Sequence, residues 1–191
     1  MNEKKYIDSK IFSKVDFTKD IFEIADYEEC SFDNCNFANQ NFVNSSFYNC
    51  NFISCNLSNA NVTGVAFQKV KFIDSKMLGI NFNDCNIFLL EVNFKNCNLR
   101  FSSFYKLDLK KTHFVNCILQ EVDFAETNLT ASKFENCDLS ATVFENTILN
   151  KADLSTSLNY SIDVNRNKIK KAKFSIDGAL SLLEKFDIII K

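Results

Sequence analysis

The chain has 191 residues, enough for one domain with a substantial core or for one array of repeats. Its net charge of −2 does not favour a nucleic acid or an anionic membrane as the partner. With many asparagines, 21 phenylalanines, three glycines and no proline, the chain has few residues for conventional turns and too few good helix formers for one long helix.

The beginning of the chain, MNEKKYIDSKIF, lacks the apolar run of a secretory signal. No stretch approaches the roughly 18 consecutive apolar residues of a membrane span. We therefore expect a soluble, cytoplasmic protein.

From Phe12 onward, every fifth residue is apolar or tyrosine. The spacing does not fit an α-helix, on which a five-residue step rotates about 500° and lines no face, and it does not fit a flat strand, on which an odd step alternates between the two surfaces. It fits a coil that turns a corner after each pentapeptide, so that each fifth side chain points inward. These central residues are Phe12, Phe17, Phe22, Tyr27, Phe32, Phe37, Phe42, Phe47, Phe52, Leu57, Val62, Phe67, Phe72, Met77, Phe82 and Ile87, then Phe94, Leu99, Phe104, Leu109, Phe114, Leu119, Phe124, Leu129, Phe134, Leu139, Phe144, Leu149 and Leu154.

The series slips by two residues in IFLLEVNF. If the extra residues form a corner bulge over residues 88–93, Phe94 continues the interior column of Phe72, and two opposing columns stay rich in phenylalanine on both sides of the slip. A short repeat of fixed period predicts a solenoid whose units stack on their neighbours. We expect one continuous solenoid over residues 1–156 and a separate cap over residues 157–191.

The cysteines share one position, two residues before a central residue, where the chain otherwise has mostly small side chains. This position predicts small buried hydrophobic groups. A disulfide framework is the alternative, but three of the cysteines would stack about one strand spacing apart, and the absence of an export signal favours thiols. One histidine, His113, with spacings of 20 residues matches no metal-ligand motif. The cysteines are Cys30, Cys35, Cys50, Cys55, Cys85, Cys97, Cys117 and Cys137.

Tandem pentapeptides with a small residue, a polar residue and then Phe or Leu, such as Cys35-Asn36-Phe37 and Ala152-Asp153-Leu154, resemble the pentapeptide repeat proteins over residues 10–156. The resemblance implies an all-β solenoid, a right-handed quadrilateral parallel β-helix with four pentapeptides per coil and about seven coils. Hydrogen bonds from coil to coil are expected in the outward column formed by Asn34, Ser54, Asp74, Asn96, Asn116 and Asn136.

The C-terminal segment is expected to cover the last coil. Its apolar spacing predicts one helical face made of Ile176, Ala179, Leu180, Leu183 and Phe186. Ser175 or Asp177 is the expected N-cap, and DIII, residues 187–190, reads as a short strand.

The same segment is similar to that of the quinolone-resistance (Qnr-like) group, in which two rods join end to end. The alternative is a cap that covers only its own rod. The resemblance implies a homodimer through Leu180, Leu182, Leu183, Phe186, Ile188 and Ile190.

No nucleophile-elbow, phosphate-loop or zinc-protease motif is present, so we expect no enzyme, no cofactor and no catalytic residue. In the Qnr-like group the rod resembles B-form DNA and occupies the DNA site of type II topoisomerases, gyrase and topoisomerase IV. The resemblance implies a DNA-mimicking gyrase binder that gives quinolone-type protection and makes no direct nucleic-acid contact. The most acidic face, which otherwise reads as an ordinary solvated face and also contains Lys106, has Glu23, Asp84, Asp123, Glu126 and Glu145.

A structural or protein-binding scaffold is the second hypothesis. Apolar side chains crowd the outward positions of the fourth and fifth coils, and clustered exposed apolar groups often mark contact sites. In the alternative, the bulge folds back and covers Leu78 and Phe101. The cluster consists of Leu78, Phe88, Leu89, Phe101 and Tyr105.

Overall fold

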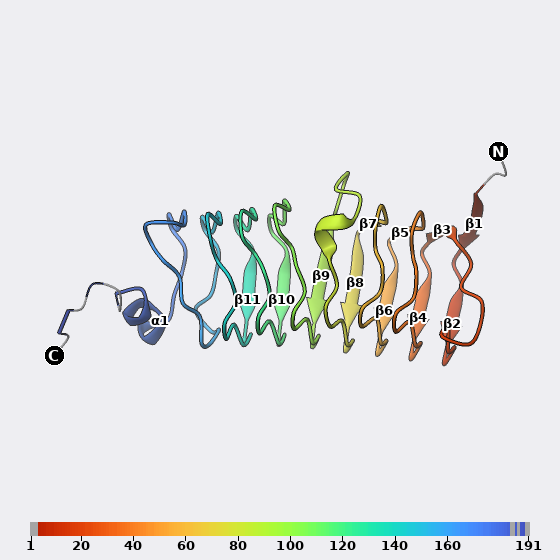
Figure 1. The fold of residues 1–191 in the computed structure, drawn as a ribbon, viewed down its shortest axis with the longest axis horizontal. Helices are drawn as coiled ribbons and strands as arrows, with labels where there is room; N and C mark the ends of the chain where they lie inside the picture. Colours follow the sequence, from red (N-terminus) through yellow and green to blue (C-terminus); the bar gives the residue numbers. More distant parts are fainter. Residues whose placement is uncertain (1–3, 184–185, 187, 190–191) are drawn as a thin grey trace.

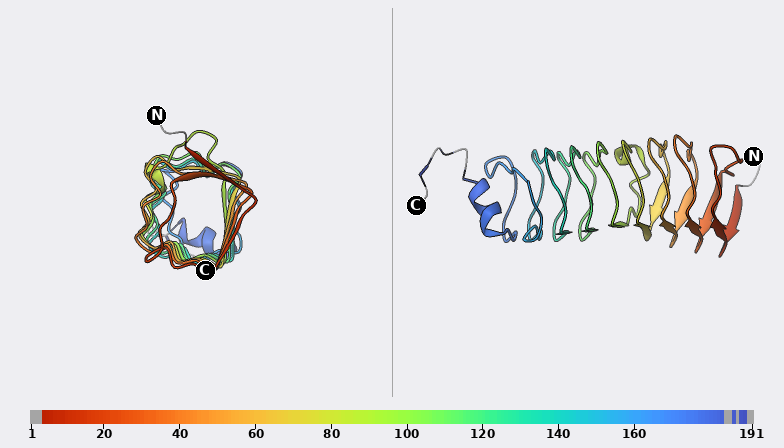
Figure 2. Two further views of the ribbon diagram at one scale, coloured as in Figure 1. Left: turned by 90° about the vertical axis from the view of Figure 1, so that its right-hand side faces the viewer. Right: turned by 90° about the horizontal axis from the view of Figure 1, so that it is seen from below.

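The computed structural model describes residues 4–183, 186, 188 and 189. They form a parallel β-solenoid of about seven turns with one short C-terminal helix, which confirms the predicted fold class. The solenoid is a straight rod with β1 and α1 at opposite ends (Figure 1). Seen along the rod, its coils superimpose as a four-sided outline (Figure 2).

Two sides of the rod carry parallel sheets. The larger sheet contains, in order, β2 (Ile11–Ser13), β4 (Ser31–Asp33), β6 (Asn51–Ile53), β8 (Val70–Ile73), β9 (Val92–Lys95), β10 (His113–Val115) and β11 (Lys133–Glu135). The smaller sheet contains β1 (Lys5–Asp8), β3 (Ala25–Glu28), β5 (Ser46–Tyr48) and β7 (Ala66–Gln68). Isolated parallel bridges, such as Ser103 to Asp123, join the coils on the other sides.

We number the four sides in the order in which the chain visits them, by the central residues that they turn inward. Consecutive faces share an edge, so the edge between faces 4 and 1 lies opposite the edge between faces 2 and 3 (Figure 2). Face 1 contains Phe12, Phe32, Phe52, Phe72, Phe94, Phe114, Phe134 and Leu154; face 2 contains Phe17, Phe37, Leu57, Met77, Leu99, Leu119 and Leu139; face 3 contains Phe22, Phe42, Val62, Phe82, Phe104, Phe124 and Phe144; face 4 contains Ile7, Tyr27, Phe47, Phe67, Leu109, Leu129 and Leu149.

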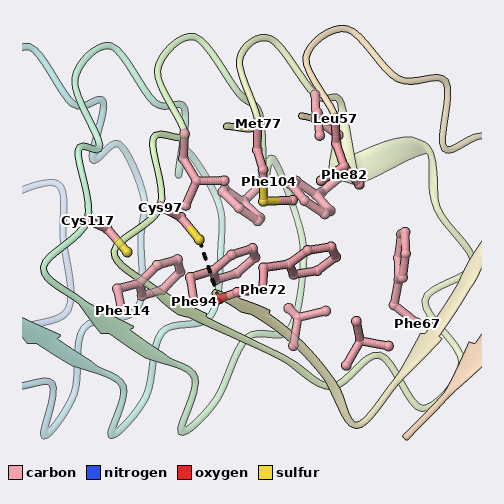
Figure 3. Packing of buried hydrophobic residues seen from close by; sticks show 14 of the residues in the cluster. Leu57, Phe67, Phe72, Met77, Phe82, Phe94, Cys97, Phe104, Phe114 and Cys117 are labelled. Carbon is pink, nitrogen blue, oxygen red and sulfur yellow. Dashed lines mark hydrogen bonds between the residues drawn. The ribbon is translucent and has the colours of Figure 1, made fainter. Parts of the chain in front are cut away.

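The interior contains stacked phenylalanine rings. Along face 1, the ring centroids of Phe94 and Phe114 are 5.2 Å apart with the planes inclined by 8°, and Phe104 and Phe124 stack in the same way on face 3. Across the interior, Phe94 meets Phe104 edge to face at 5.8 Å (Figure 3). Stacking along the rod and edge contacts across it both suit the ring quadrupole, and the two predicted columns are confirmed.

All eight cysteines are buried free thiols, as predicted. The Cys97 thiol lies 3.4 Å from the Phe72 carbonyl oxygen and donates to it (Figure 3). Burial raises the pKa of the Cys50, Cys55 and Cys85 thiols to about 12. Protonated sulfurs therefore fill the small spaces between the rings.

The corners use residues in the left-handed region in place of glycine. Asn34, Asn96 and Asn116, for example, have φ values of 52°, 54° and 51°. Asparagine tolerates this conformation better than most residues, which explains how the chain turns with three glycines. The predicted outward column is confirmed from Asp74 to Asn136: Asn136 donates to Asn116 at 3.2 Å, Asn116 to Asn96 at 3.0 Å and Asn96 to Asp74 at 2.7 Å. At its N-terminal end the Asn34 amide donates instead to Asp33 in its own coil.

The two extra residues leave the rod at the edge between faces 4 and 1, in the loop that projects between β8 and β9, just after the short 3-10 helix η1 (Phe82–Asp84) (Figure 1). Ile87, predicted to point inward, is 70% exposed, and Leu90 packs against the core instead. The Glu91 amide donates to the Phe67 carbonyl at 3.0 Å, and the Glu91 carbonyl accepts from Val70 at 2.9 Å. The ladder is thus restored at Glu91 and the solenoid is continuous.

Backbone pairing also continues past residue 156. The amides of Leu149 and Leu154 donate to the carbonyls of Lys168 and Lys173, at 2.8 and 2.9 Å. The fivefold series resumes in phase after exposed Asn159, and its later members, Val164, Ile169 and Phe174, pack against the core. The solenoid ladder therefore extends beyond the predicted end of the repeat, to Lys173. The series is interrupted at Asn159 by a single polar residue and then continues.

The helix α1 (Ile176–Ser181) follows the last pairing, and Ser175 is its N-cap, accepting from the Gly178 amide at 3.0 Å. Its buried side is not the predicted apolar face: Gly178 is buried, whereas Ile176 is 82% exposed. A Cβ on residue 178 would overlap the Tyr160 hydroxyl, so glycine lets the helix lie against that ring.

The short strand predicted after the helix is not observed at Ile188 and Ile189. Its other two residues, Asp187 and Ile190, lie outside the described residues.

Candidate protein-binding surfaces

The structure brings the five predicted carboxylates to one side of the rod. They flank the central residues of face 3, and all but Asp123, which is partly buried, are exposed. Glu126 and Glu145 are in adjacent coils, where the Glu126 amide donates to the Glu145 carbonyl at 2.7 Å. Asp123 lies in the same coil as Glu126, whereas Glu23 is near the other end of the rod. The set is Glu23, Asp84, Asp123, Glu126 and Glu145.

Three of these carboxylates form ion pairs. Lys5 lies 2.7 Å from Glu23, and Lys106 lies 3.5 Å from Glu126. Arg166 donates to Glu145 at 2.6 Å. Sequence reasoning placed only Lys106 on this face, because Lys5 precedes the first central residue considered and Arg166 follows the predicted end of the repeat. The pairs lower the negative potential of face 3.

Among the described residues, the two remaining carboxylates make polar contacts and no ion pair. Asp123 accepts from the Ala125 amide at 2.8 Å, and Asp84 accepts from the Asn83 side chain at 2.8 Å. Tyr105, predicted to be part of the apolar cluster, belongs to the acidic network instead: its hydroxyl donates to Glu126 at 2.9 Å. The Tyr105 side chain and Glu126 together raise the pKa of Lys106, which stays a cation on this face.

The predicted apolar cluster is divided between opposite edges. Phe88 and Leu89, 69% and 62% exposed, project from the edge between faces 4 and 1. Leu78, partly buried, and Phe101, 52% exposed, lie at the edge between faces 2 and 3. The loop therefore neither joins Leu78 and Phe101 in one patch nor covers them. The separation follows from the coil geometry, because pentapeptides two apart in sequence point to opposite sides.

A hollow lies on the surface beside the loop that carries Phe88 and Leu89. It is lined by Tyr48, Lys69, Leu89, Leu90 and Lys110, among others. These residues come from coils on both sides of the loop. The hollow combines apolar atoms with lysine side chains, and Glu91 also lines it.

Most of the predicted dimerisation residues are exposed. Leu180, Leu183, Phe186 and Ile188 are between 37% and 54% exposed. Leu182 is buried at 9% exposure and is not available to a partner, and Ile190 lies outside the described residues. Sequence reasoning missed two exposed apolar side chains in the same segment, Ile176 and Ile189.

Within the part of the chain that the structure describes, no group of three or more His, Cys, Asp or Glu side chains is arranged to hold a metal ion. None of the helices in the described residues has the length and apolar character needed to cross a bilayer. His113, the single histidine, is exposed on β10.

Comparison with known proteins gives a family and a fold. The family model described as pentapeptide repeat region matches residues 20–89, 45–114 and 88–174. No curated protein matches at a significant level. A trypsin-treated variant of QnrB1, a plasmid-mediated fluoroquinolone resistance protein, is similar with a TM-score of 0.75 and 19% identity, over 98% of this chain and 92% of that one.

Full-length QnrB1 gives a TM-score of 0.63 and 16% identity, over 96% of this chain and 100% of that one. At identities this low, the structural similarity shows a shared fold and nothing further. The family model spans most of the chain and coincides with the paired coils, and the chain belongs to the pentapeptide repeat family.

Proposed function

We propose that this protein is a non-catalytic rod that binds a type II topoisomerase such as gyrase through face 3, in place of DNA, and so protects it from quinolones. The observation that supports this function best is the position of five carboxylates on one side of the rod. The similarity of the fold to QnrB1, over 98% of the chain, is consistent with it.

The charge geometry determines what kind of binding to expect. Successive coils are about 4.8 Å apart, so Asp123, Glu126 and Glu145 form one compact acidic group. Duplex DNA has one charge per roughly 1.7 Å of its axis, and the pairs with Lys5, Lys106 and Arg166 dilute the acidic face further. Binding through face 3 should therefore be weak and should weaken further as salt rises, because exposed charges are screened beyond about 8–10 Å.

We further propose an end-to-end homodimer through the exposed residues Leu180, Leu183, Phe186 and Ile188. The exposure of these four side chains on the segment that closes the solenoid supports this interface. A dimer would place two acidic faces on one rod of twice the length. Action on gyrase places the protein in the cytoplasm.

The test measures binding to purified gyrase without DNA, and quinolone inhibition of supercoiling with DNA. Asp123→Asn, Glu126→Gln and Glu145→Gln together should weaken binding at least tenfold and remove protection. The matched control, Glu29→Gln, Asp33→Asn and Glu135→Gln, makes the same charge change away from face 3 and should bind as the wild type does. No binding of the wild-type protein at micromolar concentration and low salt would reject the topoisomerase assignment.

A protein-binding scaffold is the second candidate function, and the exposure of Phe88 and Leu89 on a projecting loop favours it. Exposed apolar side chains of this size are typical of contact sites. In the same binding assay, this function predicts the opposite pattern: loss of binding on Phe88→Ala, little salt dependence, and tolerance of the three face-3 substitutions.

A further inference from the structure

A line of lysines follows the edge between faces 4 and 1 over the C-terminal part of the rod. All are exposed. Their positions in the sequence are irregular, but the coils bring them to one side. We call this set the lysine edge: Lys69, Lys71, Lys95, Lys110, Lys111, Lys133, Lys151, Lys168, Lys170, Lys171 and Lys173.

Backbone pairing places these lysines next to one another. The Lys151 amide donates to the Lys170 carbonyl at 2.9 Å, so the two residues are on adjacent coils. Lys111, Lys151 and Lys171 occupy the same corner position, with φ values of 61°, 59° and 60°. At about 4.8 Å per coil they are separated by about 10 and 5 Å along the rod.

Few negative charges oppose this line. The carboxylates along the same stretch are Glu91, Asp108, Glu135 and Asp153. Asp108 pairs with Lys110 at 2.7 Å, and Asp153 pairs with Lys173 at 3.0 Å. Among the described residues no ion pair involves the remaining lysines of the C-terminal half, which are Lys111, Lys133, Lys151, Lys168, Lys170 and Lys171.

The N-terminal part of the same edge has the opposite charge. It carries the acids Asp8, Glu28, Glu29 and Asp33 against the base Lys10. A net charge of −2 for the chain therefore conceals a basic surface that begins near Lys69 and continues to the end of the solenoid. Because screening confines exposed charges to about 8–10 Å, a partner at this end responds to the lysines and not to the net charge.

The lysine edge lacks apolar anchors between Lys110 and Lys171. The large apolar side chains that are exposed in this part of the described chain are Ile118 and Leu158 on face 2 and Val143 on face 3. A hollow on the edge is lined by Thr130, Asn150, Lys151, Lys170 and Lys171. Protein interfaces depend on buried aromatic or aliphatic anchors, whereas contacts with phosphates need only positive charge and polar groups.

We propose that the lysine edge binds the sugar–phosphate backbone of a nucleic-acid duplex. From Lys111 to Lys171, the part without apolar anchors, the edge spans three coil spacings, about 14 Å, or about four base pairs at 3.4 Å each. Lysine contacts a phosphate as a point charge without bidentate geometry, so binding is independent of sequence. The inference replaces the expectation, drawn from net charge and from the Qnr-like resemblance, that the protein makes no direct nucleic-acid contact, and it does not depend on topoisomerase binding.

The test is fluorescence anisotropy of a labelled DNA duplex of about 20 base pairs, titrated with the full chain between about 50 and 200 mM salt. The variant Lys151→Gln, Lys170→Gln and Lys171→Gln keeps the side-chain length and removes three charges. We expect it to bind at least tenfold more weakly, with the slope of log affinity against log salt reduced by about 2.7 if all three lysines contact phosphates.

The matched control is Lys14→Gln, Lys19→Gln and Lys76→Gln, which removes three exposed lysines elsewhere on the rod. It should bind within twofold of the wild-type protein, and all three proteins should keep the wild-type circular dichroism spectrum. Equal losses in both variants, or no wild-type binding at about 100 µM protein in the lowest salt, would overturn the proposal. Tighter binding of poly-glutamate than of the duplex would also overturn it and assign the edge to an acidic protein. Gyrase binding without DNA, measured on the same variants, separates this result from the proposed function.

Discussion

Phe72 and Phe94 stack with their ring centroids 5.4 Å apart and their planes inclined by 10°, although the chain between them is two residues longer than in the other coils. Their strands β8 and β9 are paired in register. The stack is preserved, and Ile87, Phe88 and Leu89 are exposed in a loop outside the core. A shift of two residues in the ladder would have misplaced every later coil, whereas a loop at one corner costs only local exposure.

Deletion of Phe88 and Leu89 should leave the fold intact. It restores the regular 20-residue spacing between Phe72 and Phe94, and a shorter loop lowers the entropy cost of closing the coil. We expect a wild-type circular dichroism spectrum and an unchanged or higher urea midpoint. Loss of cooperative unfolding in the shortened protein would show that the loop residues support the core.

Substitutions on either side of the loop should lower the free energy of unfolding by very different amounts. Phe94→Ala removes a buried ring between Phe72 and Phe114 and should lower the free energy of unfolding by about 3–5 kcal/mol. Ile87→Ala should change it by less than about 0.5 kcal/mol, because that side chain is 70% exposed. Urea unfolding measures both values, and comparable losses would contradict the outward position of Ile87.

The thiols should react slowly in the native protein. All eight are buried, and a thiol reagent attacks the thiolate, which burial disfavours. We expect slow labelling of the native chain and eight rapid labels after denaturation, counted by mass spectrometry. Rapid native labelling of most thiols would contradict their inward position.

The stability of the fold should decrease at alkaline pH. Burial raises the pKa of Cys50, Cys55 and Cys85 to about 12 in the folded protein, above an unfolded value near 8.5. Their protonated form therefore stabilises the fold fully below about pH 8.5, and this contribution is lost as the pH rises toward 12. The expected slope is up to about 1.4 kcal/mol per pH unit for each thiol.

Urea unfolding at neutral pH and at about pH 10 measures this dependence. The double variant Cys50→Ala and Cys55→Ala should show a shallower decrease than the wild-type protein, because two of the titrating groups are gone. Equal slopes for the two proteins would assign the alkaline loss to other groups.

The C-terminal segment should determine the oligomeric state. We expect the intact chain to be a dimer in multi-angle light scattering and Leu180→Asp with Leu183→Asp to be a monomer. The control, Ile118→Asp with Val143→Asp, changes apolar residues of similar exposure on faces 2 and 3 and should remain a dimer. A monomeric wild-type chain at tens of micromolar would exclude the end-to-end assembly.

The fivefold series was enough to predict the coil, the two phenylalanine columns and the buried cysteines. Side chains at the central position point inward once in every five residues. The positions of Phe72, Cys97 and Phe114 in the repeat are therefore enough to predict on which side of the rod each lies. The asparagine corners from Asn34 to Asn146 follow from the same period, since each falls two residues after a central position. These features depend on local geometry repeated many times.

Other features depend on contacts between distant residues. Whether Ile87 or Leu90 turns inward depends on where the backbone rejoins the ladder, and the face that α1 buries depends on the fit of Gly178 against Tyr160. The five-residue period does not predict which charged side chains come together. Arg166 reaches Glu145 and Lys151 adjoins Lys170 because residues about 20 apart stack, whereas residues 10 apart point to opposite sides. Stacking of successive coils thus turns scattered charges into an acidic face and a lysine edge.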